Sequence, residues 1–196
     1  MRNNMRDDLG MAEGEVHAAA REVLDFWFDE LTPKQHFAKD EALDRTIARR
    51  FSGLRGALLS SGAVKWRDTP ETLLAAVIVL DQFSRNIYRG QAAAFAADAL
   101  ALTLTQEALA AGWDSQLPPD RRQFLYMPLM HSEDPQVQQQ SLRRFEALGD
   151  DEVLCFARDH HDVIERFGRF PSRNEALGRE TSAEERDYLN QRSASW

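Results

Sequence analysis

The chain contains only one cysteine, Cys155, among its 196 residues. A single cysteine excludes an intrachain disulfide and a cluster of thiolate metal ligands. Its neighbours Leu154 and Phe156 are apolar, and this setting is typical of a small core residue rather than a reactive thiol. A compact chain of this length can bury enough surface to fold without a covalent or metal staple.

Long apolar runs are also missing. The longest extends from Leu73 to Leu80 and is much shorter than the roughly 20 residues of a membrane-spanning helix. Residues 1–15 lack the apolar segment that a secretory signal requires, so we expect a cytoplasmic protein.

The chain has fewer positive than negative residues. It contains 24 lysines and arginines and 32 aspartates and glutamates, which gives a net charge of −8 and a pI of about 5.2. Nucleic acids and anionic membranes both select basic surfaces, so we expect neither as a partner. A local basic pocket can still exist inside an acidic protein.

Several motifs of enzymes are absent: a glycine-rich phosphate loop, a dinucleotide fingerprint, a nucleophile elbow and a His-Glu-x-x-His pair. Ser132 follows His131 directly, but adjacent residues on a helix point apart, so a serine hydrolase has weak support. We expect no cofactor and no bound metal.

Apolar residues recur at helical spacing through most of the chain, and no run alternates apolar and polar residues as a strand would. We predict an all-α fold of seven to nine helices, with residues 1–14 flexible and 15–196 forming a single domain. Short turns favour a bundle or a stack of antiparallel hairpins, although no 34-residue period is visible. The predicted helices cover residues 15–31, 40–61, 69–89, 91–111, 118–129, 134–149, 151–167 and 181–189.

Two local signals concern helix ends. Pro128 falls inside the fifth predicted helix and should kink or split it, because proline lacks the N–H that a helix uses. Thr181 and Glu184 have the spacing of a capping box, which would start the last helix.

The helix predicted from Thr69 to Arg89 is the centre of the sequence. Thr69 is the expected N-cap and Pro70 the first helical residue. The apolar run that follows leaves no polar face, so this helix should be buried. Polar groups at the end of a buried helix must be paired or serve a site. We call this end the first polar segment, and its polar residues are Asp81, Gln82, Arg85, Asn86 and Arg89.

Two further polar segments interrupt core-forming helices. In the second polar segment, residues 130–133, His131 and Glu133 could act as a general acid–base pair. The third polar segment, residues 166–174, interleaves arginines with phenylalanine, glycine and proline. Its polar residues include Arg166, Arg169, Arg173 and Asn174.

Arginines in such segments can grip a carboxylate or a phosphate through two parallel hydrogen bonds. Each segment taken alone also fits a structural role, in which the arginines meet a helix dipole or pair with nearby carboxylates. Three segments in one small chain raise the case for a shared site.

Six pieces of the chain together form a recognisable pattern: residues 23–28, 80–83 with Arg85-Asn86, 94–96 with Asp98, 126–133, 166–171 with Arg173-Asn174, and 177–179. On these pieces the chain resembles, from residue 23 to residue 189, a bacterial family known as domain of unknown function nine-two-four. The resemblance implies a tetratricopeptide-like α-helical architecture and no established reaction. The family pattern has proline at the position of Ser84 and histidine at that of Ser172, so a mechanism that needs a histidine at 172 loses support.

The leading hypothesis is a protein that binds a small anionic or polar ligand in a pocket lined by the three polar segments. His131 and Glu133 are the candidate catalytic pair. The predicted ligand-binding residues are Asp81, Gln82, Arg85, Asn86, Arg89, Arg166, Arg169, Arg173 and Asn174.

Two alternatives stay open. Tetratricopeptide-like folds commonly serve as interaction scaffolds, so the partner could be a peptide. A metal-dependent phosphohydrolase of the HD type is the weaker alternative. Its ligands would be His131, His161 and Asp162, with Asp187 as a conceivable last ligand. The sequence leaves open the oligomeric state and whether a reaction is catalysed.

Overall fold

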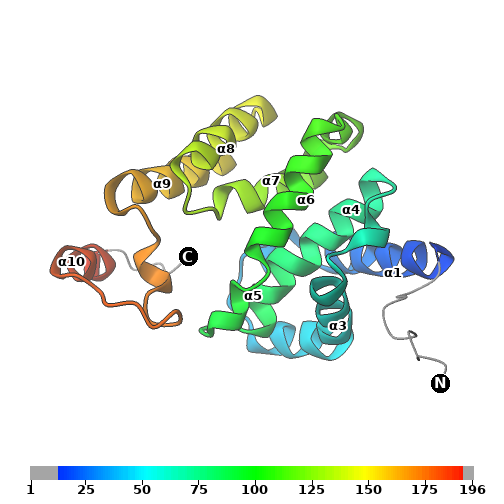
Figure 1. The fold of residues 1–196 in the computed structure, drawn as a ribbon, viewed down its shortest axis with the longest axis horizontal. Coiled ribbons are helices and arrows are strands. Elements are labelled where there is room, and N and C mark those ends of the chain that lie inside the picture. Colours follow the sequence, from blue (N-terminus) through cyan, green and yellow to red (C-terminus); the bar gives the residue numbers. More distant parts are fainter. Residues whose placement is uncertain (1–12, 192–196) are drawn as a thin grey trace, which may run out of the picture.

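A computed structural model of the chain describes residues 13–191. This part consists of helices and the turns between them, without a strand, which confirms the predicted all-α class (Figure 1). The α-helices are α1 Glu13–Asp25, α2 Pro33–His36, α3 Glu41–Ser61, α4 Pro70–Val77, α5 Ser84–Ile87, α6 Asp98–Ala110, α7 Pro119–Met130, α8 Pro135–Leu148, α9 Asp151–Phe167 and α10 Ala183–Gln191. Two π-helices, η1 Phe26–Glu30 and η3 Ile78–Phe83, continue α1 and α4. Short 3-10 turns are η2 Val64–Trp66, η4 Ala92–Ala94, η5 Trp113–Gln116 and η6 Pro171–Arg173.

The first helix begins earlier than expected. Residues 13 and 14, which we predicted to be flexible, belong to α1, and the rest of that predicted segment lies outside the described residues. None of the helices between residues 13 and 191 combines the length and apolar character needed to cross a membrane. The tetratricopeptide-like stacking and the single domain stay predictions.

The central helix forms as the sequence predicts. The Thr69 hydroxyl accepts a hydrogen bond from the N–H of Thr72 at 3.2 Å, and Pro70 occupies the first turn. Every residue from Thr72 to Ser84 is buried. Helices α1, α6 and α7 pack against α4, while α3 packs against η3 and α5. The polar end of this helix is therefore enclosed by other elements.

An alanine-rich segment departs from its predicted helix. We expected a helix from Gln91, but α6 begins only at Asp98. The guanidinium of Arg55 donates a hydrogen bond to the Ala93 carbonyl oxygen at 2.9 Å and to Ser84 Oγ at 3.1 Å. These contacts hold residues 92–97 in turns, so tertiary pairing outweighs the helix propensity of alanine.

Helix α7 includes Pro128 and ends at Met130, so the proline falls in its last turn and does not split the helix. The kink that we gave as the other outcome stays a prediction, whereas the predicted capping box needs correction. The capping box of α10 lies one residue later than predicted, on Ser182 and Glu185. The Ser182 N–H donates to Glu185 Oε2 at 2.7 Å, and the Glu185 N–H donates to Ser182 Oγ at 3.2 Å.

The prediction for Cys155 is wrong, because its side chain is exposed. Helix α9 buries Leu154 and Ala157, and the residue after a buried position turns about 100° away from it. An apolar neighbour in sequence is thus no guide to burial on a helix.

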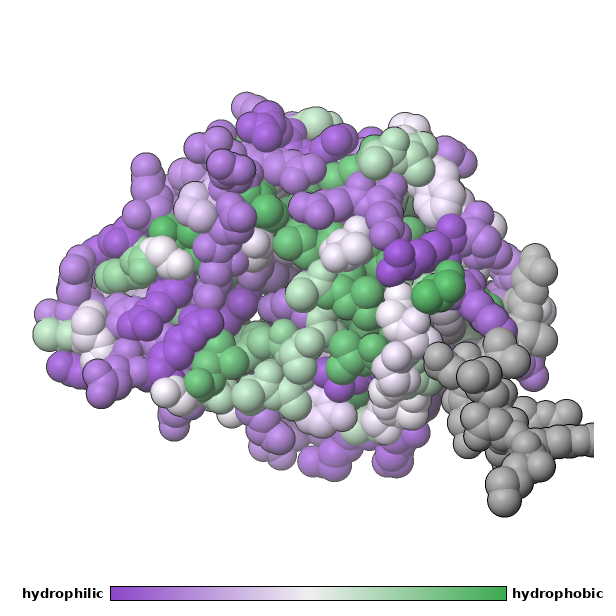
Figure 2. Space-filling view, in the orientation of Figure 1, coloured by the Kyte–Doolittle hydropathy of each residue, from purple (hydrophilic) through white to green (hydrophobic). Residues whose placement is uncertain are grey.

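The hydrophobic core runs from α1 to the first half of α9, and a second small cluster joins Val163, Ile164 and Phe170. Helix α8 packs on both α7 and α9, while α10 lies apart from α1–α6 at the other end of the molecule (Figure 1). Figure 2 shows that the surface at the α10 end is mostly hydrophilic. Because the apolar cluster of the C-terminal part is small, hydrogen bonds and ion pairs contribute much of its contact with the rest of the molecule.

Phe83 tests the central packing, because its ring contacts those of Phe26, Trp27 and Phe51 at centroid distances of 5.8, 5.5 and 4.7 Å. We expect Phe83→Ala to lower the free energy of unfolding in urea by about 3–5 kcal/mol, the cost of a large core cavity. The matched control is Phe156→Ala, whose ring is 49% exposed and whose loss should cost less than about 1 kcal/mol. Equal losses for the two variants would contradict the packing described.

Candidate functional site

The three polar segments meet in one cluster. The first contributes Asp81 and Arg85, the second His131 and the third Arg173, and hydrogen bonds connect all four residues. The Arg173 guanidinium donates to the His131 carbonyl oxygen at 2.8 Å. Residues almost a hundred positions apart in sequence thus share one set of contacts, which we call the His131 cluster.

A buried carboxylate lies at the base of the His131 cluster. Asp81 is fully buried on η3, where the central helix widens into a π-helix, a feature frequent at functional sites. Its Oδ1 lies 2.8 Å from His131 Nδ1 and 3.0 Å from Arg85 Nη1, and the Gln82 amide donates to Oδ2. Burial opposes ionisation of Asp81, but Arg85 and His131 outweigh it, so the carboxyl pKa lies below its ordinary value.

The sequence-based list of site residues missed Asp98. This carboxylate accepts hydrogen bonds from both arginines: from Arg85 Nη1 and Nη2 at 3.0 and 3.1 Å, and from Arg173 Nη1 at 3.3 Å. Asp98 is the first residue of α6, where a carboxylate also complements the helix dipole. The sequence placed Asp98 inside the helix predicted over residues 91–111, so apart from its place among the pieces that match the family nothing pointed to a site residue.

Arg173 is held between two aromatic rings. Its guanidinium carbon lies 4.8 Å from the centroid of Phe95 and 4.4 Å from that of Phe170. Burial and the nearby charge of Arg85 lower the pKa of Arg173 to about 10, although Asp98 and Glu133 act in the opposite sense. The cluster therefore places two guanidinium groups close enough to repel each other.

His131 is neutral at pH 7 and has one ring nitrogen to offer. Burial and the charge of Arg85 lower its pKa below 6.5, against the opposing effect of Asp81. Because the ionised Asp81 accepts, Nδ1 carries the proton and Nε2 keeps its lone pair. Nε2 has no hydrogen-bond partner among the described residues, yet it is not one of the buried atoms without a partner, so it reaches solvent.

His160 is a second residue that the list missed. Its ring centroid lies 6.0 Å from that of His131 and 5.5 Å from that of Phe170, and its Nδ1 donates to the Phe156 carbonyl oxygen at 2.8 Å. Burial and the neighbouring His131 lower the pKa of His160 to about 3. Helical spacing places a histidine of α9 on or near its buried face, but spacing alone does not predict the contact of His160 with the cluster.

Glu133 does not pair with His131, its predicted catalytic partner. Its two carboxylate oxygens bind Arg179 at 2.9 Å each, and Oε1 also accepts from the Phe170 N–H at 2.9 Å. Burial opposes ionisation, but these two partners and Arg173 keep the Glu133 pKa below its ordinary value. Glu133 thus fastens the chain around residue 170 to the end of α7, while Asp81 is the residue that holds the imidazole.

The other predicted ligand-binding residues lie outside the His131 cluster. Asn86 and Arg89 both bind Asp44 on α3. Arg166 pairs with Glu184, and Arg169 pairs with Glu185 and with the Glu180 carbonyl oxygen. Asn174 is buried, its amide donates to Thr181 Oγ1 at 3.4 Å, and its Oδ1 has no partner in the described part.

The residues of the metal alternative are not brought together as a set. Within residues 13–191, His161 and Asp162 gather with Glu165, their ligand atoms lying within 4.8 Å of one another. This group is on the outer face of α9, with both carboxylates exposed, and it includes neither His131 nor Asp187.

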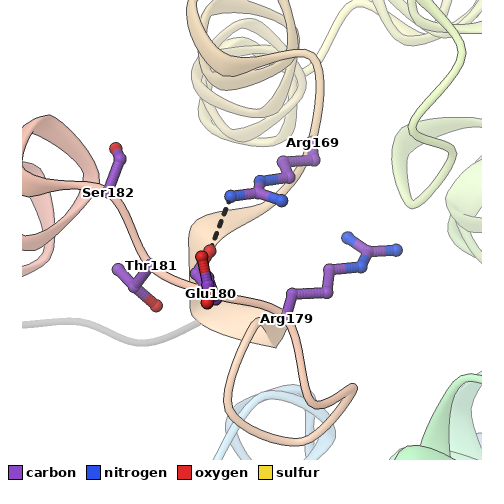
Figure 3. Close-up of a pocket in the computed structure, with 5 residues that line it drawn as sticks. All are labelled: Arg169, Arg179, Glu180, Thr181 and Ser182. Atoms are coloured by element: carbon purple, nitrogen blue, oxygen red, sulfur yellow. Dashed lines mark hydrogen bonds between the residues drawn. The ribbon is translucent and has the colours of Figure 1, made fainter.

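Two surface pockets lie away from the central residues of the His131 cluster. The pocket in Figure 3 has a volume of about 480 Å³ and lies between Arg169, Arg179 and the chain at residues 180–182. Glu180 lies below Arg169 and to the left of Arg179 in Figure 3, and Arg169 donates to its carbonyl oxygen. A second pocket of about 300 Å³ lies between α1 and α3. Neither of these two pockets is lined by Arg85, His131 or Arg173.

The fold and the His131 cluster define an all-helical protein with a buried carboxylate–imidazole pair and two clustered arginines. The chain belongs to the bacterial proteins of unknown function called DUF924, whose family model matches residues 23–193. It is similar to a solved structure titled "Structure of Protein of Unknown Function ATU0120 from Agrobacterium tumefaciens". The two share 38% sequence identity over 90% of this chain and 99% of that chain, with a TM-score of 0.86. No curated protein matches the chain.

The buried His160 predicts how stability depends on pH. Because its pKa is about 3 when folded and 6.5 ordinarily, only the unfolded state takes up the proton between these values. The free energy of unfolding should therefore fall as the pH drops below 6.5, by up to about 1.4 kcal/mol per pH unit for this group. Urea denaturation between about pH 7 and 5, where carboxylates are still mostly ionised, measures it.

His160→Gln should show a shallower pH dependence than the wild type. The control is His161→Gln on the same helix, because this neighbouring histidine lies outside the buried contacts that His160 makes with His131 and Phe170. A slope unchanged by His160→Gln would contradict the buried, neutral state of this histidine.

Proposed function

We propose that this protein binds a small anionic ligand, a carboxylate or a phosphate, at the solvent-facing edge of the His131 cluster. The observation that carries the proposal is the convergence of Arg85, Arg173 and the accessible Nε2 of His131 from three remote segments of the chain. Two guanidinium groups beside an imidazole offer both charge and direction to a bound anion.

Asp98 supports the carboxylate-binding geometry. Its two oxygens accept three hydrogen bonds from the two guanidinium groups, as the oxygens of a bound carboxylate would. Arg173 adds an electrostatic argument, because Arg85 and burial depress its pKa to about 10. A bound anion near this pair would attract both guanidinium groups and so offset their mutual repulsion.

The exposure of the cluster favours a small ligand. The side chains of Arg85 and Asp98 are about one fifth exposed, at 21% and 22%, and those of Arg173 and His131 at 12% and 11%. A contact area this narrow suits the few atoms of a small metabolite better than the grooves and sheet edges that take up an extended or helical peptide. The rings of Phe95 and Phe170 also cover the guanidinium of Arg173 and limit the space beside it.

The test is calorimetric titration with a panel of carboxylated and phosphorylated metabolites at fixed ionic strength. We expect at least one ligand whose affinity falls about tenfold or more in Arg173→Gln, because a charge-assisted hydrogen bond is lost. Arg166→Gln is the matched control, since Arg166 belongs to the same segment but pairs with Glu184 at the surface. It should bind as the wild type does.

Asp98→Asn separates a direct effect on binding from misfolding, because this variant should gain affinity and a misfolded protein would lose it. Removing this negative charge frees positive potential at the arginines, so the variant should bind the same ligand more tightly than the wild type. A panel without any bound compound, or equal affinities for the wild type, Arg173→Gln and Asp98→Asn, would overturn the proposal.

A further inference from the structure

We infer that the ligand carries an O–H donor next to its anionic group, and that Nε2 of His131 accepts the hydrogen of that O–H. The inference rests on the proposed function and names the ligand class more closely: hydroxycarboxylates and protonated phosphates rather than simple carboxylates or sulfate. Asp81 acts as the positioning residue, because it fixes which ring nitrogen faces the ligand.

The argument starts from what the cluster can offer outward. Arg85 and Arg173 carry only N–H donors, which suit the charged oxygens of an anion. The oxygens of Asp98 already accept from both guanidiniums, and Asp81 is fully buried. Nε2 of His131 is thus the side-chain acceptor of the cluster that reaches solvent without a partner in the described part.

The hydrogen bonds of Asp81 fix the direction of this acceptor. His131 Nδ1 lies 2.8 and 3.0 Å from the two oxygens of Asp81, so a proton on Nδ1 is shared between them. Arg85 and Gln82 bind the same carboxylate and prevent it from turning away. The imidazole is therefore held with its lone pair on Nε2.

Burial and the charged groups around the ring preserve the neutral imidazole. Burial is the largest cause of its lowered pKa, and Arg85 on α5 and Arg173 on η6 act in the same sense. Asp81 on η3 is the carboxylate that opposes them, while His160 on α9 faces His131 as a neutral ring. At pH 7 the ring thus accepts a hydrogen and does not donate one through Nε2.

Hydrogen phosphate and sulfate test this inference directly, because both are tetrahedral anions but only phosphate keeps an O–H near pH 7. Glycolate and acetate form a second pair that differs by one hydroxyl group. Titration calorimetry of the full chain at pH 7 and constant ionic strength compares the members of each pair. We expect the O–H member to bind about tenfold more tightly, since its rival leaves Nε2 without a donor.

Three variants and one pH series keep the test sharp. His131→Phe removes the acceptor and should bring the affinity ratio close to one, while His161→Phe, a histidine of α9 outside the cluster, should leave the ratio unchanged. Asp81→Asn should also abolish the preference, because it no longer fixes the proton on Nδ1. On the unmodified chain, acidification that protonates His131 should remove the preference without any substitution.

The outcomes separate the two proposals. Binding of both members of each pair with equal affinity would overturn this inference and leave the proposed anion site standing. A preference that survives His131→Phe would overturn it as well. Failure of all four anions to bind at millimolar concentrations would overturn this inference, and the proposed anion site would fall as well if the metabolite panel also gave no bound compound.

Discussion

The burial of the Asp81 carboxylate constrains the rest of the structure. A carboxylate withdrawn from water is strongly destabilising unless it is paired and hydrogen-bonded. Asp81 meets this requirement with Arg85 one helical turn away, Gln82 beside it and His131 at the end of α7. The need to satisfy one buried charge therefore brings the ends of two helices together and leaves an imidazole in a fixed orientation.

A second set of polar contacts joins the C-terminal part to this centre. Arg173 binds Asp98 and the His131 carbonyl oxygen, while Glu133 binds Arg179 and the Phe170 N–H. The apolar cluster of this part is small and centres on Val163, Ile164 and Phe170. Directional hydrogen bonds and ion pairs thus determine where the third polar segment lies against the helices.

The sequence predicts the fold and the place of the cluster because both follow from local patterns. The apolar run before Asp81 indicates a buried helix with a polar end, and proline and threonine mark its start. The family resemblance also implied an α-helical chain, which agrees with the all-α class observed. Alanine propensity fails at residues 92–97, where the Arg55 contact with Ala93 holds a turn. Cys155 shows the other limit, since apolar neighbours do not determine which face of a helix a residue occupies.

The pairings inside the cluster could not be predicted in the same way. An arginine can pair with any carboxylate within reach, and the sequence contains 32 acidic residues. The sequence alone therefore does not determine which pairs form. Local spacing favoured Glu133 as the partner of His131, yet the helix end turns Glu133 toward Arg179 and presents His131 to Asp81. Asp98 and His160 join from elements whose relative placement depends on tertiary packing. The sequence thus indicated which polar segments contribute to the cluster, but the contacts between their side chains depend on the tertiary structure.

The central claim is that Asp81 holds a neutral His131 with its proton on Nδ1. Long-range proton–nitrogen correlation NMR measures this directly, with His131→Gln used to assign the signals. The account predicts a neutral imidazole protonated at Nδ1 at pH 7, with a titration midpoint below the ordinary 6.5. A proton on Nε2 or an imidazolium ion at pH 7 would contradict it.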